Sequence, residues 1–93
     1  MIDFIKYAKF VDAVTSRESK YYPDFAARIY ELAEDGVPTE RLLTAAVGMS
    51  AESGEFTEII KKIIFQGKPV NEENLFHLKR EMGDIMWYFM QAC

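Results

Sequence analysis

The sequence of 93 residues predicts an all-α protein that folds as a single domain covering residues 1–93. Apolar residues recur at helical spacing in four segments, glycine and proline separate these segments, and no segment shows the alternation of a half-buried strand. The length suits one core. Hydrophobic residues make up 49% of the chain, which is more than so short a chain buries alone. We therefore expect the protein to form an oligomer.

The N-terminal part of the chain predicts two short amphipathic helices. The first covers residues 2–18, where apolar side chains share one face. Two tyrosines and a proline at residues 21–23 interrupt it, and the second helix is predicted over Asp24–Asp35. Gly36 follows directly, as glycine often does at a helix C-terminus.

A longer third helix is predicted over residues 40–66, with Thr39 as its N-cap. Gly67 ends it, because glycine adopts the left-handed conformation that closes many helices. Gly48 and Gly54 lie inside this helix, where each costs up to about 1 kcal/mol relative to alanine. We expect them to serve either close helix packing or access to a site.

The fourth predicted helix begins after Asn71, a favourable N-cap residue, and runs to the end of the sequence. Between Ile85 and Ala92 it is apolar almost all round, which is typical of a helix buried on several sides or at a subunit interface. No stop signal precedes Cys93, so we expect further helices beyond this residue.

The charge and cysteine content exclude several classes of function. A net charge of -4 disfavours a nucleic acid polymer or an anionic membrane as the main partner, because both select basic surfaces. The single cysteine forms no internal disulfide, and no apolar run approaches the roughly 20 residues that span a bilayer. These features predict a cytoplasmic protein.

Two acidic pairs are the most informative feature of the sequence. Glu52 and Glu55 lie three residues apart on the third helix, and Glu81 and Asp84 repeat this spacing on the fourth. Each pair points in one direction, since residues at this spacing are about 60° apart around a helix. If the two helices form an antiparallel hairpin that turns at Lys68, Glu52 is level with Asp84 and Glu55 with Glu81.

Both pairs interrupt apolar helix faces. Four carboxylates gathered in such a place repel one another and lose hydration unless protons or a cation neutralise them. Oxygen ligands without histidine or cysteine favour Mg²⁺, with Mn²⁺ as an alternative. The sequence therefore predicts a metal site made of Glu52, Glu55, Glu81 and Asp84. Surface pairs on solvated helix faces are the alternative interpretation.

Basic residues near the acidic pairs are candidates for binding phosphate groups. Lys61 and Lys62 follow Glu55 by one to two helical turns, and Lys79 and Arg80 come directly before Glu81. Lys62 is the best placed of the four, since it lies seven residues, nearly two turns, from Glu55. Glu58 extends the acidic stripe but drifts away around the helix, which indicates either a surface position or a position that supports the cluster from outside. No Glu-x-x-His motif occurs, which argues against a ferritin-like di-iron bundle.

These motifs resemble those of the MazG-like all-α nucleoside triphosphate pyrophosphohydrolases, which are related to dimeric dUTPases and phosphoribosyl-ATP pyrophosphatase. The pattern is Glu52-x-x-Glu55, then 25 residues, then Glu81-x-x-Asp84, with a glycine before each second acid and an apolar run after it. The similarity covers about residues 42–92. It implies a four-helix-bundle-like fold completed by dimerisation, in a homodimer or a homotetramer. It also implies Mg²⁺-dependent cleavage of a nucleoside triphosphate into a monophosphate and pyrophosphate.

One position departs from the pattern of that family. Many members have a second glutamate directly before the first motif glutamate, and this chain has Ala51 there. Glu55, a metal-bound hydroxide or a carboxylate elsewhere then has to accept the proton from water. The departure leaves a second hypothesis, a helical module that binds nucleotide or metal without turnover, and a third, a helical interaction protein.

Overall fold

The computed structural model describes all 93 residues, which form α-helices and no strands, so the predicted all-α class is confirmed. Residues Met1–Thr39 and Glu40–Cys93 form two compact units. The prediction of a single domain stays a prediction. In chain order the elements are α1 (Phe4–Val14), the 3₁₀ turn η1 (Arg17–Ser19), α2 (Tyr22–Glu34), α3 (Thr39–Phe65) and α4 (Glu72–Ala92).

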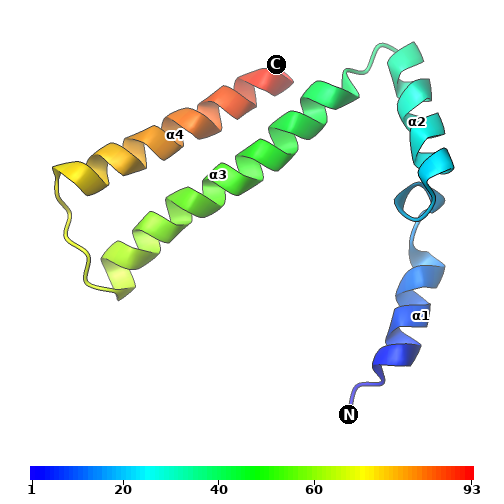
Figure 1. The fold of residues 1–93 in the computed structure, drawn as a ribbon, viewed down its shortest axis with the longest axis horizontal. Helices are drawn as coiled ribbons and strands as arrows, with labels where there is room; N and C mark the ends of the chain where they lie inside the picture. The colour runs from blue at the N-terminus through cyan, green and yellow to red at the C-terminus, as the bar shows by residue number, and fades with distance from the viewer. The chain divides into compact units, whose positions relative to one another are not determined.

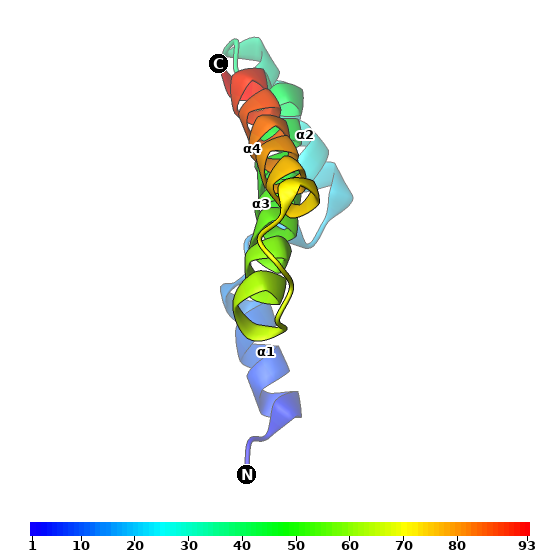
Figure 2. The same ribbon diagram turned by 90° about the vertical axis from the view of Figure 1, so that its left-hand side faces the viewer.

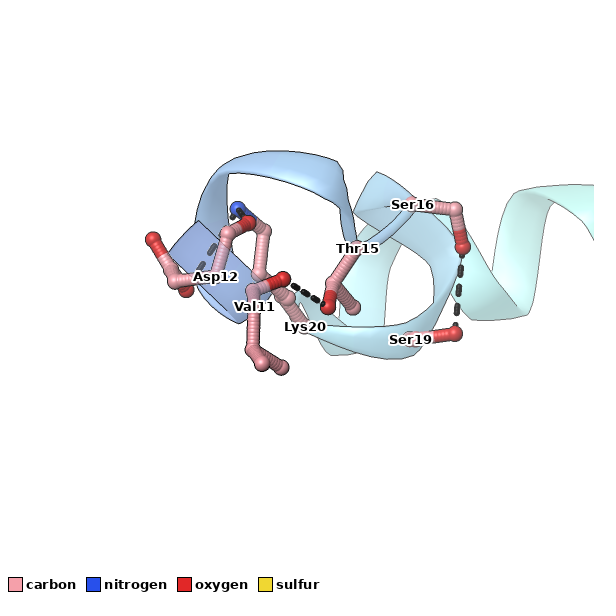
Figure 3. A network of polar contacts seen from close by, with 6 residues as sticks. All are labelled: Val11, Asp12, Thr15, Ser16, Ser19 and Lys20. Atoms are coloured by element: carbon pink, nitrogen blue, oxygen red, sulfur yellow. Dashed lines mark hydrogen bonds and ion pairs between the residues drawn. The ribbon is translucent and has the colours of Figure 1, made fainter. Parts of the chain in front are cut away.

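Helix α1 ends earlier than the predicted boundary at residue 18, because polar side chains form local bonds that compete with the helix. The Thr15 hydroxyl donates to the carbonyl of Val11 at 2.5 Å. Lys20 folds back and donates to the carbonyl of Asp12 at 2.9 Å, while the hydroxyls of Ser16 and Ser19 lie 3.1 Å apart (Figure 3). The predicted first helix is therefore a helix followed by a separate 3₁₀ turn.

Helix α2 begins two residues before its predicted start, since Pro23 fits within a first helical turn, where no backbone donor is needed. It ends as predicted at Gly36, whose φ of 79° is left-handed. The amide of Val37 then donates to the carbonyl of Leu32 at 2.9 Å, which closes the last turn.

Helices α3 and α4 lie side by side and run in opposite directions, as the green and orange ribbons show in both views (Figures 1 and 2). Gly48 of α3 faces the ring of Tyr88 of α4, and a Cβ at Gly48 would overlap that ring. Both residues are 20 positions from Lys68, so the contact agrees with the predicted register. Close helix packing therefore accounts for Gly48.

The turn between these helices is held by hydrogen bonds. Gly67 has a φ of 68°, and the amide of Lys68 donates to the carbonyl of Lys62 at 3.1 Å. Asn71 caps α4 as predicted, since its side chain accepts the amide of Asn74 at 2.9 Å. The side chain of Asn74 in turn donates to the carbonyl of Pro69 at 2.6 Å.

The start of α3 differs from the prediction. Thr39 is the first helical residue, and its buried hydroxyl has no hydrogen-bond partner, so the predicted capping bond is not formed. The backbone amide of Thr39 instead donates to the carbonyl of Val37 at 2.9 Å, which draws the chain into a tight turn before the helix.

Few side chains are buried in this structure. Ala45 is the buried hydrophobic residue, and Glu81 is a buried charged residue with only 8% of its surface exposed. Large apolar side chains along α4 are exposed to solvent, including Met86, Trp87 and Met90. None of the helices combines the length and the apolar composition that crossing a bilayer requires.

Candidate metal site

Three of the predicted carboxylates meet between α3 and α4. Glu52 and Glu55 extend from successive turns of α3, and Glu81 extends from α4. One carboxylate oxygen from each residue lies within 4.8 Å of the other two. The helical spacing of Glu52 and Glu55 aligns them on one face, and the hairpin register brings Glu81 to that face. The convergence predicted for these three residues is therefore observed.

The three side chains differ in their access to solvent. Glu81 is buried, Glu52 is half-buried and Glu55 is exposed. The Oε2 atoms of Glu52 and Glu81 are enclosed and have no hydrogen-bond partner. Buried carboxylate oxygens without a donor are costly, because they lose water and gain nothing in exchange. Two enclosed oxygens of the cluster residues thus have no hydrogen-bond donor.

The neighbouring acids change the acidity of Glu81. When Glu81 holds a proton it donates a hydrogen bond to Glu52, and this contact raises the pKa of Glu81 above its ordinary value of 4.5. Burial and the negative charges of Glu52 and Asp84 raise this pKa further, whereas a hydrogen bond from Glu55 opposes the shift. The cluster therefore favours any species that brings positive charge to Glu81.

Asp84 is the predicted ligand that lies apart from the other three. It is half-buried on α4 and near enough for its charge to act on Glu81, yet it is outside the group whose oxygens lie within 4.8 Å of one another. The sequence placed Asp84 level with Glu52, but Glu81 occupies the space beside both α3 acids. A fourth ligand role for Asp84 stays a prediction.

The donor set fits a hard divalent cation. All three groups are carboxylates, which Mg²⁺ and Mn²⁺ prefer over softer ligands. The two unpartnered oxygens, Oε2 of Glu52 and Oε2 of Glu81, are free to coordinate. Glu55 is exposed, so its carboxylate is open to solvent.

The two predicted phosphate-binding lysines have different surroundings. Lys61 forms an ion pair with Glu58 at 3.4 Å, and Lys62 approaches the same carboxylate at 3.8 Å. Glu58 is thus an exposed partner of both lysines, which agrees with the first of its two predicted positions. Lys62 also lines a cavity at the turn of the hairpin, whereas Lys61, Lys79 and Arg80 do not. The structure therefore separates two residues that were adjacent candidates in the sequence.

Sequence reasoning did not identify the other polar residues of this cavity, among them Lys68 and His77. His77 lies 3.9 Å from Glu73 on the same helix. The position of Lys68 in the sequence could have indicated its place. It lies midway between the two acidic pairs, and therefore at the closed end of the hairpin. Only the folded turn brings its side chain to the cavity that Lys62 lines.

Two motif glycines have no packing partner within the chain. A Cβ added at Gly54 or at Gly83 meets nothing within 4 Å, in contrast to Gly48. Both glycines directly precede an acid of the cluster region, Glu55 and Asp84 respectively. Of the two explanations for Gly54, close helix packing within the chain is therefore not supported.

Comparison with known proteins gives one relative of limited extent. The chain is 38% identical to the "Gene 37 protein" of Mycobacterium phage L5 over 64 residues, which are 68% of this chain and 56% of the phage protein. The chain thus spans little more than half the length of that curated relative. No family model matches the sequence, and no solved structure matches it.

Proposed function

We propose that this protein is a nucleoside triphosphate pyrophosphohydrolase that depends on Mg²⁺, with Mn²⁺ as a substitute. We base this on one observation: carboxylate oxygens of Glu52, Glu55 and Glu81 lie within 4.8 Å of one another. Two enclosed oxygens of this group, Oε2 of Glu52 and Oε2 of Glu81, have no hydrogen-bond partner. An acidic cluster of this kind is costly in a protein of net charge -4 unless a cation joins it. The motif resemblance to the MazG-like enzymes adds the substrate class.

The three carboxylates are suited to different tasks. Glu52 and Glu81 each have one enclosed oxygen without a hydrogen-bond partner, and these oxygens are suited to hold the cation. Glu55 is exposed, so it is the one that can also contact a water molecule entering from solvent. The bound Mg²⁺ supplies the positive charge that allows an acidic site to accept a triphosphate of about four negative charges.

In the proposed reaction, water attacks the α phosphorus of the nucleoside triphosphate, at the anhydride that joins the α and β phosphates. A new P–O bond forms, the bridging P–O bond breaks, and pyrophosphate leaves with that electron pair. Glu55 takes the proton from the attacking water, which is the role left open by alanine at position 51. The products are a nucleoside monophosphate and pyrophosphate.

The direct test measures pyrophosphate release from the common ribo- and deoxyribonucleoside triphosphates in the presence of Mg²⁺. We expect Glu55→Gln to lower the rate by about 100-fold or more, since a positioned base contributes roughly that factor. Glu40→Gln is the matched control, because Glu40 is exposed on the same helix and lies three turns from the cluster. It should leave the rate unchanged.

Two other results would each favour a different function. Nucleotide binding that depends on Mg²⁺ without any pyrophosphate release would favour the binding module. An absence of any Mg²⁺ effect on nucleotide binding or on the melting temperature would favour an interaction protein.

We also propose that the active form is a homodimer or a homotetramer. The support is the amount of apolar surface left open on α4, where Met86, Trp87 and Met90 are each more than half exposed. Burying such side chains against a second copy contributes roughly 1.5–3 kcal/mol each. Sedimentation equilibrium should give a mass of at least twice 10.8 kDa, and a monomer at micromolar concentration would contradict this assembly.

A further inference from the structure

A cavity of about 410 Å³ lies at the closed end of the α3–α4 hairpin. It is formed by the last turns of α3, the connecting turn and the first turns of α4. Its polar lining consists of Lys62, Lys68, Asn71, Glu73, Asn74 and His77. No phenylalanine, tyrosine or tryptophan lines it, so it offers no ring of these types for stacking a nucleobase.

We propose that this cavity binds the pyrophosphate end of the nucleotide, with Lys62 and Lys68 as its principal phosphate contacts. This inference rests on the proposed function, because it assigns the two ends of the same substrate to two parts of the hairpin. The α phosphate lies at the carboxylate cluster, and the β and γ phosphates extend toward the turn.

The charges around the cavity favour an anion. Lys68 forms no ion pair, and Lys62 shares the exposed Glu58 with Lys61 at a distance of 3.8 Å. Exposed ion pairs of this kind are weak, so a phosphate can displace Glu58 from Lys62. Glu73 is the one carboxylate in the lining, and it lies 3.9 Å from His77.

The cavity adjoins the carboxylate cluster along both helices. Ile59 follows Glu55 by one turn on α3 and lines the cavity, and His77 precedes Glu81 by one turn on α4 and also lines it. Lys62 is seven residues beyond Glu55, about 10 Å along the helix axis. A long lysine side chain covers much of that distance, so one extended triphosphate can contact both regions.

The turn that carries Lys68 is already fixed without a ligand. The backbone of Lys68 is bonded to Lys62, and the Asn74 side chain holds the carbonyl of Pro69 at 2.6 Å. Asn71 is held in turn by the amide of Asn74. Because these bonds hold the loop in place, little ordering is required when phosphate binds.

The test measures binding of inorganic pyrophosphate to the full chain by calorimetry, with and without Mg²⁺, alongside pyrophosphate release from nucleotides. Lys62→Gln and Lys68→Gln should each raise the dissociation constant of pyrophosphate by about tenfold, since each removes a charged hydrogen bond. Lys9→Gln is the control. It removes the same charge from an exposed residue of α1 that does not line the cavity, and it should change binding less than about twofold.

The outcomes separate the two proposals. If the protein hydrolyses nucleotides but both cavity variants bind pyrophosphate like the wild type, the cavity assignment is wrong and the function stands. If no nucleotide is hydrolysed but both variants lose pyrophosphate binding, the function is wrong and the cavity remains an anion site. Equal losses in all three variants would show a general charge effect and overturn the assignment, as would a wild type that does not bind pyrophosphate.

Discussion

The polar contacts within residues 1–39 join residues that are close in sequence, whereas those within residues 40–93 also join residues that are far apart in sequence. In the N-terminal unit, side-chain polar contacts join residues at most eight positions apart, as in the bond from Lys20 to Asp12. In the C-terminal unit, Arg41 reaches Gln91 at 3.3 Å across 50 positions, and Gly48 meets Tyr88. All of the buried residues, Ala45, Gly48 and Glu81, belong to this second unit. Local signals therefore shape the first unit, whereas register between helices shapes the second and its candidate site.

The largest effect on stability is expected at the contact between α3 and α4. Gly48→Ala places a Cβ against the Tyr88 ring and should lower the free energy of unfolding by about 2 kcal/mol, as overpacking does. Gly54→Ala is the matched change on the same helix, and it meets nothing within 4 Å. It should raise stability by up to about 1 kcal/mol through helix propensity.

Urea unfolding of both glycine variants measures this difference. Equal stability of Gly48→Ala and the wild type would mean that Tyr88 is not packed on the backbone of α3. A loss of stability in Gly54→Ala would instead indicate that a second copy or another helix packs against Gly54.

A smaller effect is expected from removing the helix caps of the two units. Asn71→Ala and Asp3→Ala each remove a side-chain acceptor at a helix start and should each cost about 1 kcal/mol of helix stability. Because α1 contains no buried residue, the loss at Asp3 should stay within α1.

Hydrogen exchange followed by mass spectrometry distinguishes the two caps. Asn71→Ala should speed amide exchange in α4 and also in the facing turns of α3, whereas Asp3→Ala should speed exchange in α1 alone. Faster exchange in α3 after Asp3→Ala would show that the units are coupled.

The smallest expected effect is the pH dependence that arises from Glu81. Its pKa in the folded protein is raised above 4.5, so the folded state holds this proton more tightly than the unfolded state does. Stability from this residue is therefore present below pH 4.5 and is lost as the pH rises through the folded pKa. Glu81→Gln should remove this component.

Urea unfolding between pH 4 and pH 7 in a chelating buffer compares Glu81→Gln with the wild type. The wild type should lose stability relative to the variant as the pH rises. Parallel pH profiles would mean that Glu81 does not experience the neighbouring acids.

Much of the fold follows from features within a few residues of one another. Gly36, Gly67 and Asn71 act at helix ends as their residue types predict. The register of α3 and α4 was also predictable, since a short turn at Lys68 fixes which residues are level. The end of α1 was not, because hydroxyl groups at Thr15 and Ser16 compete with the helix only in a particular local geometry.

The candidate site was predictable in its residue types and less so in its details. Spacing and apolar surroundings identify Glu52, Glu55 and Glu81, but they do not show that Glu81 lies close to both α3 acids while Asp84 is set apart. Side-chain direction and interhelical distance decide this. The cavity at the turn was also beyond sequence reasoning, because Lys68 belongs to no motif.

The three converging carboxylates should form a site for a divalent cation. The most direct test titrates Mn²⁺ into the wild type, Glu52→Gln, Glu81→Gln and the control Glu40→Gln by calorimetry at neutral pH. We predict saturable binding to the wild type, at least about tenfold weaker binding to the two cluster variants, and unchanged binding to the control. A wild type that binds no Mn²⁺, or cluster variants that bind it like the wild type, would contradict the claim.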